Sequence, residues 1–230
     1  MTAYKHIFFD LDHTLWDFNV NCFLTLEELY ESYQLHHLGF PLDAFQKTYL
    51  KINNQMWDGF HKGTVTKEDI REKRFEYTFN DLGYQKKDVP GTMENDFLRI
   101  CPAKGRLFPY TYEVLDYLKE KYTLHIITNG FKETQHIKLS TSGLSKYFKE
   151  VIESDVCGFK KPDKRIFDHA LELGHAKKEE SLMIGDDFEA DVLGARNAGI
   201  DQVFVNRNNF SHKEMITYEI DCLSKLKEIL

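Results

Sequence analysis

The residues best suited to chemistry follow a short apolar run near the start of the chain. Ile7-Phe8-Phe9 ends in two acids one residue apart, Asp10 and Asp12, within the sequence Asp-Leu-Asp-His-Thr. Two carboxylates at such spacing can bind a divalent cation or exchange protons with a substrate. The pattern D-x-D-x-T arises by chance in roughly a few per cent of chains of this length, so its position directly after a strand-like run favours a functional role.

Three further segments carry polar groups directly after apolar runs. They contain Thr128-Asn129-Gly130, then Lys160-Lys161-Pro162, and then Asp186, Asp187 and Asp191. In an open α/β sheet the ligand binds outside the carboxyl ends of the strands, so these segments are expected to converge on one crevice. Their carboxylates suit a hard divalent cation, whereas the hydroxyl, the backbone N–H groups and the lysine suit a phosphoryl group.

Short β-rich runs alternate with helical patterns, and these elements must position the polar groups. The predicted strands are Lys5–Asp10, Thr123–Thr128, Glu150–Ser154, Ser181–Gly185, Gln202–Asn206 and Tyr218–Ile220. The alternation predicts an α/β fold, a Rossmann-like doubly wound parallel sheet with helices on both faces. Capping and stop signals predict helices from Asp163 to Gly174 and from about Glu189 to Gly199. An amphipathic pattern predicts a last helix over Leu223–Leu230.

The alternation is interrupted once, between the first and second strands, where about 100 residues replace a single crossover helix. Apolar residues recur there at helical spacing, as in Phe45, Tyr49, Ile52 and Met56. We therefore expect an inserted all-helical domain over residues 17–100, with the α/β core made of residues 1–16 and 101–230. The aromatic stripes are expected to form the core of the inserted domain.

Composition excludes several classes of function. The 230 residues carry 30 Lys+Arg and 37 Asp+Glu, a net charge of −7, which argues against nucleic acid or an anionic membrane as partner. No apolar run approaches the roughly 20 residues of a membrane helix. The four cysteines form no C-x-x-C motif, so we expect them to be free thiols in a reducing cytoplasm. Signatures of serine hydrolases, dinucleotide enzymes and P-loop ATPases are missing, and a small phosphorylated molecule remains the expected partner.

The four ordered motifs resemble the haloacid dehalogenase superfamily, specifically its phosphatases with a helical cap inserted after the first motif. The resemblance spans nearly the whole chain and makes residues 17–100 the cap. It implies that Asp10 is the nucleophile and Asp12 the general acid/base. It further implies that Thr128, Asn129 and Lys161 bind phosphate, Lys161 also being catalytic. Mg²⁺ would be held by Asp10, the backbone carbonyl of Asp12 and Asp186, with Asp191 in support.

The activity implied is Mg²⁺-dependent hydrolysis of a phosphomonoester through an aspartyl-phosphate. Asp12 favours phosphate esters over haloacids, because a halide leaving group needs no proton. Leu15-Trp16-Asp17-Phe18 and Thr-Asn-Gly look most like the nucleotidases that act on pyrimidine 5′-monophosphates. The alternatives are a phosphoglycolate or sugar-phosphate phosphatase, a sugar phosphomutase, or a phosphometabolite-binding protein without catalysis.

Several positions depart from the commonest pattern or leave a choice open. His13 stands where Gly is frequent in the superfamily, and Tyr110-Thr111 follow a Pro where a small Gly-Ala pair is common. Asp187 is an alternative to Asp186 as the metal ligand. Lys160 is expected to be a surface charge, since the resemblance places the functional lysine directly before Pro162.

Overall fold

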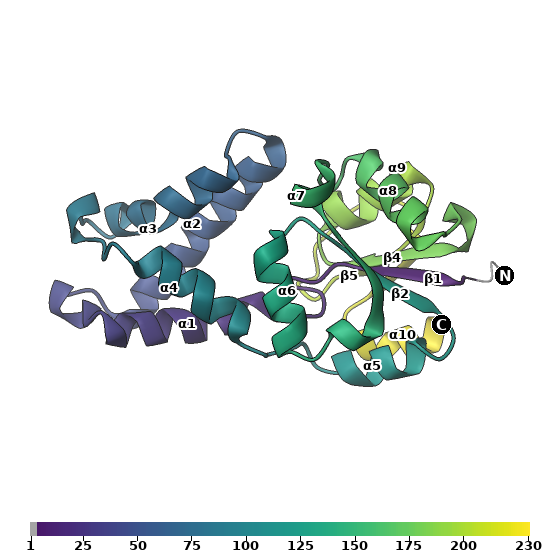
Figure 1. Cartoon of the computed structure of the whole chain (residues 1–230), viewed down its shortest axis with the longest axis horizontal. Helices are drawn as coiled ribbons and strands as arrows, with labels where there is room; N and C mark the ends of the chain where they lie inside the picture. The colour runs from purple at the N-terminus through teal and green to yellow at the C-terminus, as the bar shows by residue number, and fades with distance from the viewer. Residues whose placement is uncertain (1–3) are drawn as a thin grey trace. The chain divides into compact units, whose positions relative to one another are not determined.

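A six-stranded parallel sheet in the order β3-β2-β1-β4-β5-β6 is the framework of the α/β part of the chain (Figure 1). The computed structural model describes residues 4–230. The strands are β1 (His6–Phe9), β2 (Thr123–Thr128), β3 (Phe148–Glu153), β4 (Ser181–Gly185), β5 (Asp201–Val205) and β6 (Tyr218–Ile220). This order is that of a doubly wound α/β fold, so the predicted fold class is confirmed.

The contacts divide the chain into two compact units. The first comprises the chain up to Phe18 together with Gly105–Leu230, and the second comprises Asn19–Lys104. The first unit contains α5 (Thr111–Leu118), α6 (Lys132–Thr141), α7 (Ser154–Cys157), α8 (Lys164–Gly174), α9 (Gly194–Ala198) and α10 (Leu226–Ile229). The second contains α1 (Phe18–Ser32, whose first residue belongs to the first unit), α2 (Leu42–Lys62), α3 (Lys67–Asp81) and α4 (Met93–Ile100). Single 3₁₀ turns lie at Leu35–Leu38, Lys86–Asp88, Cys101–Ala103, Ser145–Tyr147, Lys178–Glu180 and Leu223–Lys225.

Helices cover both faces of the sheet, α8 and α9 on one side and α5 and α10 on the other (Figure 1). On the α8 side, Phe8 and Met183 from the sheet pack with Ile166, Phe167 and Ala170 from α8 in one buried cluster. These three α8 residues recur at i, i+1 and i+4, and Asp163 caps the helix by accepting a hydrogen bond from the Arg165 backbone N–H. The strands are buried on both faces, as is typical of parallel sheets.

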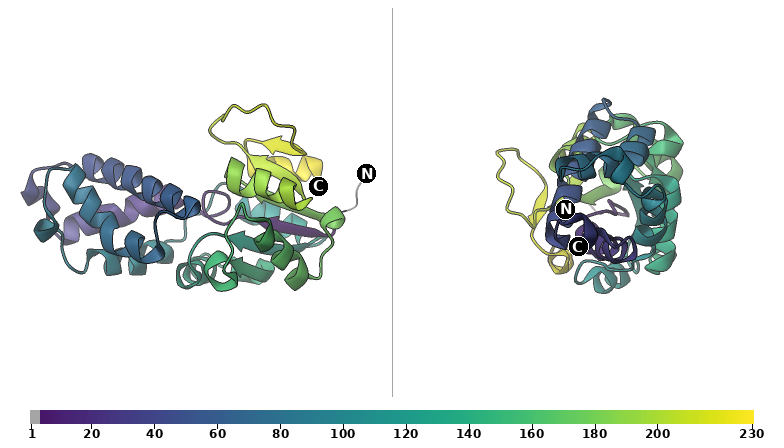
Figure 2. Two further views of the ribbon diagram at one scale, coloured as in Figure 1. Left: turned by 90° about the horizontal axis from the view of Figure 1, so that it is seen from above. Right: turned by 90° about the vertical axis from the view of Figure 1, so that its left-hand side faces the viewer.

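The second unit is built around aromatic side chains of its own helices. In this unit α2 and α3 lie side by side (Figure 2). Phe45 and Tyr49 of α2 meet Phe75 and Phe79 of α3 at ring-centroid distances of 5.0–6.4 Å, and all four are buried. The prediction that these stripes form a local core is confirmed. None of the helices within residues 4–230 is both long and apolar enough to cross a membrane.

The segment after β4 differs from its prediction as one continuous helix. Residues Phe188–Leu193 form a π-helical turn, and α9 begins only at Gly194. The backbone N–H groups of Asp191 and Val192 both donate to the carbonyl of Asp187, which widens this turn. π-turns of this kind are frequent at functional sites because they redirect a side chain. The predicted final helix is also shorter, a 3₁₀ turn followed by α10.

A buried histidine lies in the middle of the sheet. His125 of β2 is fully buried, and its ring stacks on that of Phe8 with 4.7 Å between the ring centroids. Its Nε2 atom lies 3.2 Å from the Nδ1 atom of His6. Burial, together with the positive charges of His6 and Lys149, lowers the pKa of His125 to about 4 from the usual 6.5. The ring is therefore neutral in the folded protein at neutral pH.

This histidine predicts a loss of stability in mild acid. The imidazole of His125 takes up a proton near pH 6.5 in the unfolded chain but only near pH 4 in the folded chain. Its contribution to the free energy of unfolding is therefore full above pH 6.5 and falls as the pH drops from 6.5 to 4. We expect the contribution of His125 to the free energy of unfolding to fall by about 1–2 kcal/mol between pH 7.5 and 5. Urea unfolding at both pH values measures the change.

Two variants separate this effect from general acid destabilisation. His125→Phe should shrink the difference between the two pH values, whereas exposed His37→Gln should leave it as in the wild type. An unchanged difference in His125→Phe would show that other groups cause the acid sensitivity.

Candidate active site

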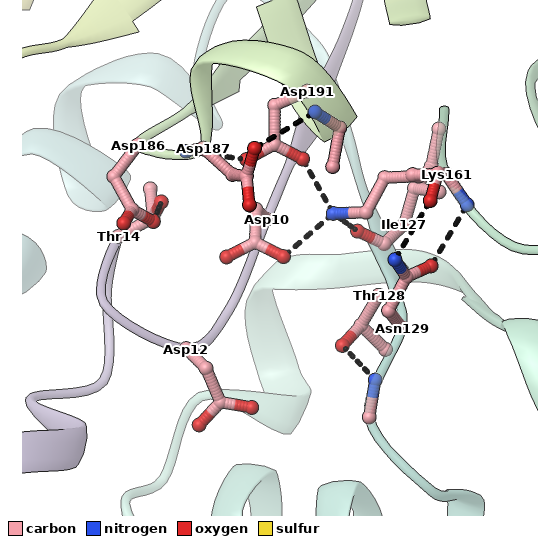
Figure 3. Close-up of polar contacts among 12 residues, drawn as sticks. Asp10, Asp12, Thr14, Ile127, Thr128, Asn129, Lys161, Asp186, Asp187 and Asp191 are labelled. Atoms are coloured by element: carbon pink, nitrogen blue, oxygen red, sulfur yellow. Dashed lines mark hydrogen bonds and ion pairs between the residues drawn. The ribbon is translucent and has the colours of Figure 1, made fainter. Parts of the chain in front are cut away.

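The register of the sheet brings the predicted polar residues to one edge. Phe9, the last residue of β1, pairs with Ile126 of β2 on one side and Ile184 of β4 on the other. Asp10 follows β1, and its backbone N–H donates to the Ile184 carbonyl at 2.9 Å. The carboxyl ends of β2 and β4, which carry Thr128 and Gly185, thus flank Asp10 (Figure 3). The strand order reverses at β1, which is where doubly wound sheets bind their ligands.

Lys161 lies at the centre of the site and is buried. Its Nζ atom donates three hydrogen bonds, to Asp10 Oδ1 at 2.7 Å, to Asp191 Oδ1 at 2.6 Å and to the Ile127 carbonyl at 2.8 Å (Figure 3). These bonds use all three ammonium hydrogens. Burial alone would lower the pKa of Lys161, but the two carboxylates raise it above its ordinary value. The side chain is therefore a fixed positive charge against Asp10.

Three carboxylates meet beside this lysine. Oxygen atoms of Asp10, Asp186 and Asp191 all lie within 4.8 Å of one another. Burial and mutual repulsion raise the pKa of Asp186 well above its ordinary value, raise that of Asp10, and raise that of Asp191 to about 7. One lysine cannot balance three buried carboxylates, so the cluster has the charge and the hard oxygen donors that suit Mg²⁺.

The individual oxygens separate candidate ligands from a supporting group. Asp186 Oδ1 accepts from the Thr14 hydroxyl at 2.8 Å, and Asp10 Oδ1 accepts from Lys161. The Oδ2 atoms of both residues accept no hydrogen bond from residues 4–230. Asp191 differs, since Lys161 donates to its Oδ1 atom and the Asp187 backbone N–H donates to its Oδ2 atom. Asp10 and Asp186 are thus the residues with oxygens free for a cation.

The π-turn and one glycine place the Asp191 side chain. The turn at Phe188–Leu193 contains Asp191 and directs its carboxylate toward Lys161 (Figure 3). A Cβ atom at Gly185 would lie 2.2 Å from Asp191 Oδ2, closer than any real contact. Asp187, the alternative ligand considered above, is exposed and instead caps the turn by accepting from the Ala190 N–H at 2.8 Å. It is not among the clustered carboxylates.

Asp12 lies apart from this cluster, and its side chain points away from Asp10 (Figure 3). The Nζ atom of Lys138 in α6 donates to Oδ1 at 2.6 Å and to Oδ2 at 2.8 Å. The Nε2 atom of Gln135 donates to Oδ2 at 2.8 Å. Burial would raise the pKa of Asp12, but these partners together hold it below its ordinary value. The pKa of Asp12 is thus shifted in the opposite direction to the pKa values of the crowded acids beside Lys161.

Thr128 presents a hydroxyl hydrogen to the site. Its Oγ1 atom accepts from the Gly130 N–H at 3.0 Å and from Gln135 Nε2 at 2.9 Å. A hydroxyl oxygen has two acceptor positions, and both are filled. The hydrogen of the hydroxyl has no acceptor within residues 4–230, which leaves it for a bound phosphoryl oxygen.

Asn129 makes different contacts from those of a simple phosphate ligand. Its Nδ2 atom donates to the Lys161 carbonyl at 3.0 Å, and its Oδ1 atom accepts from the Lys161 N–H at 2.8 Å. The carboxamide therefore holds the backbone that carries the buried lysine. Lys160, in contrast, has no bond to Asp10 or Asp191 among those described.

Several site residues escaped the sequence analysis. Gln135 and Lys138 sit on a helix whose pattern gave no functional signal, and Thr14 was recognised only as part of the first motif. Arg207, which follows β5, donates to the backbone carbonyls of His13 and Thr14 at 2.7 and 3.0 Å. His13 has a φ of +62°, a conformation that glycine adopts without strain, which accounts for the frequent Gly at this position.

The known proteins that this chain resembles are described as hydrolases, nucleotidases or phosphatases. Residues 4–199 match the family described as haloacid dehalogenase-like hydrolase. The chain is 31% identical to YfnB of Bacillus subtilis, covering 100% of this chain and 97% of that protein, and 31% identical to the pyrimidine 5′-nucleotidase YjjG of Escherichia coli, covering 97% and 96%. It is 34% identical to a glyceraldehyde 3-phosphate phosphatase of Methanothermobacter thermautotrophicus, covering 98% and 99%. The crystal structure of YfnB bound to magnesium matches with a TM-score of 0.87 at 30% identity, covering 99% and 98%.

The crowded acids predict how Mg²⁺ affects stability. Asp186→Asn removes one repelling charge and keeps an acceptor for Thr14, so we expect the metal-free protein to gain about 1 kcal/mol at pH 7.5. We expect Mg²⁺ to raise the melting temperature of the wild type, and this rise should disappear in Asp186→Asn because the free Asp186 oxygen is lost. Thermal melts with chelator and with saturating Mg²⁺ measure both effects.

The exposed neighbour Asp187 provides the matched control. Asp187→Asn should retain the Mg²⁺-induced rise. If Asp186→Asn kept a rise of wild-type size, the cation would have to bind elsewhere.

The close approach at Gly185 predicts a local steric effect. Gly185→Ala should displace Asp191 and destabilise the protein by about 1–3 kcal/mol, because an added methyl overlaps the carboxylate. Gly91→Ala is the control, since its methyl would enter open space and should change stability by less than about 0.5 kcal/mol. Equal urea midpoints for the two variants would contradict the proposed packing.

Proposed function

Because this chain belongs to the haloacid dehalogenase-like hydrolases, we propose that it is a Mg²⁺-dependent phosphatase that forms an aspartyl-phosphate, with a nucleoside 5′-monophosphate as its substrate. Its relatives include enzymes named as phosphatases and as a pyrimidine 5′-nucleotidase. The observation that carries the proposal is the arrangement around Asp10. This carboxylate is fixed by buried Lys161 beside two further acids, while a second kind of acid, Asp12, lies apart from them.

In this proposal Asp10 attacks phosphorus through Oδ2, the oxygen that Lys161 leaves free. The bond from phosphorus to the leaving oxygen breaks, and a covalent intermediate splits one difficult displacement into two easier ones. Lys161 holds the nucleophile by its other oxygen, so the carboxylate cannot rotate away. The Thr128 hydroxyl donates to a phosphoryl oxygen as its charge redistributes.

Asp12 is proposed to move the protons of both steps. Protonated Asp12 gives its proton to the leaving oxygen when the first bond breaks. The resulting carboxylate then takes a proton from water, whose oxygen attacks phosphorus while the bond to Asp10 breaks. The products are the alcohol and inorganic phosphate, with Asp10 and Asp12 restored.

The residues that would hold Mg²⁺ are Asp186 by its free oxygen and Asp10 by the oxygen that does not attack phosphorus, with the Asp12 carbonyl as a further ligand and Asp191 in support. When bound, the ion supplies the positive charge that lets an anionic nucleophile approach an anionic phosphate. Lys161 supplies one further positive charge from the protein itself. Without a cation, the raised pKa of Asp186 marks the repulsion that these residues face.

The choice of substrate rests on similarity to relatives. The nucleotide is favoured by YjjG, which matches nearly the full chain, and by the motif residues around Trp16. A phosphorylated small aldehyde or sugar is the second candidate, because a glyceraldehyde 3-phosphate phosphatase matches equally fully at 34% identity. We propose that residues 17–100 act as the cap that selects between such substrates and residues 1–16 and 101–230 as the catalytic core. We also propose a cytoplasmic location, in keeping with four free cysteines.

One experiment tests reaction and substrate together. Phosphate release is measured from nucleoside monophosphates, sugar phosphates, glyceraldehyde 3-phosphate and phosphoglycolate, with Mg²⁺ and with chelator. We expect chelator-sensitive turnover that is highest on pyrimidine monophosphates. Asp10→Asn should lower kcat by at least about 10⁴-fold because the nucleophile is lost, while its melting temperature stays close to that of the wild type.

Exposed Glu189→Gln serves as the control and should keep full activity. Turnover by Asp10→Asn at the wild-type rate would disprove the aspartyl-phosphate. A maximum on a sugar phosphate or on glyceraldehyde 3-phosphate would keep the reaction and replace the substrate.

A further inference from the structure

Two polar side chains of α6 donate hydrogen bonds to Asp12, the proposed acid/base group. Gln135 and Lys138 lie three positions apart, and both are buried. We propose that they are positioning residues for Asp12, holding its carboxylate by hydrogen bonds that leave Oδ1 as the atom that exchanges protons with the leaving group and with water. This inference rests on the proposed function of Asp12, but it assigns a role to residues outside the four motifs.

The contacts of Lys138 fix the carboxylate in two directions. Its Nζ atom bonds to both oxygens, at 2.6 and 2.8 Å, and such charge-assisted pairs are among the stronger hydrogen bonds in proteins. The ammonium also lies 4.6 Å from the centre of the buried Trp16 ring, which holds it from another side. Lys138 therefore has a fixed position from which to orient Asp12.

Gln135 limits the use of one oxygen and links Asp12 to the phosphate-binding residue. Its two Nε2 hydrogens go to Asp12 Oδ2 at 2.8 Å and to Thr128 Oγ1 at 2.9 Å. Asp12 Oδ2 thus accepts two hydrogen bonds, whereas Oδ1 accepts only that from Lys138 among the described residues. Oδ1 keeps a lone pair, which makes it the atom that carries the proton.

Close packing fixes the position of the Gln135 side chain. It is fully buried, and a Cβ atom at Gly130 would lie 1.5 Å from Nε2. The bare glycine backbone provides the passage through which the amide reaches both Asp12 and Thr128. The proton-carrying group and the phosphate-binding hydroxyl are thereby held by the same amide nitrogen.

Leaving groups of different basicity test this role. For a mechanism through a covalent intermediate, kcat/KM reports only the steps up to formation of the phosphoenzyme. An alkyl phosphate needs the proton from Asp12 in that step, whereas 4-nitrophenyl phosphate releases a stable anion and does not. Lys138→Met should lower kcat/KM for the alkyl phosphate by about 10–100-fold, and for 4-nitrophenyl phosphate by no more than about 3-fold. Lys138→Arg, which can still bond to both oxygens, should restore much of the loss.

Lys132→Met is the matched control, because it removes the same charge from an exposed position on the same helix. It should leave both values unchanged. Equal losses on both substrates in Lys138→Met would overturn the inference, since they would place the role of Lys138 in phosphate binding or folding. No loss on either substrate would also overturn it. If Lys138→Met does not fold, Lys138→Gln, which keeps one donor, is compared in the same way.

The experiment separates failure of this inference from failure of the proposed function. Wild-type protein that releases no phosphate from either substrate with Mg²⁺ would refute the phosphatase itself. If the wild type is active but Lys138→Met loses the same fraction of kcat/KM on both substrates, only the role of Gln135 and Lys138 is refuted.

Discussion

The buried ammonium of Lys161 is the interaction on which the site depends. A lysine in a protein interior is stable only if its hydrogen bonds and its charge are satisfied. Here two carboxylates and one carbonyl take all three hydrogens. The same bonds fix Asp10 at the carboxyl end of β1, so the stability of the site and the orientation of the proposed nucleophile have one physical origin.

Other features of the core follow from this lysine. Asn129 holds its backbone, the π-turn supplies Asp191, and Gly185 leaves the space that Asp191 occupies. The excess of negative charge that remains makes the site suited to a cation. Asp12 stands in a different environment, paired with its own lysine, so two acids separated by one residue acquire opposite pKa shifts. Neighbouring carboxylates with different environments are the usual means by which one site holds groups for different tasks.

The fold and the residues at the strand ends could be predicted from the sequence, because parallel strands, buried on both faces, read as apolar runs that stop at polar residues. The register of β1 with β2 and β4 then brings those residues together. The π-turn could not be predicted, since it results from the hydrogen bonds of Asp187 and from the position of Lys161. Gln135 and Lys138 were missed for a related reason: Lys138 is buried while the neighbouring Ile137 is 39% exposed. The periodicity of apolar residues reports burial in an apolar core and gives no signal for a polar side chain buried against a charge.

The central position of β1 also affects when the sheet can assemble during synthesis of the chain. β1 is flanked by β2 and β4, and Lys5 beside β1 pairs with Glu180 beside β4 across 175 positions of sequence. At the usual speed of translation, β1 waits roughly ten to thirty seconds for that partner to leave the ribosome. During that time the apolar segment Ile7-Phe8-Phe9 lacks one of its two neighbours, and the acids on either side of Lys161 have not met. The proposed catalytic centre therefore assembles late in synthesis, although Asp10 is among the first residues made.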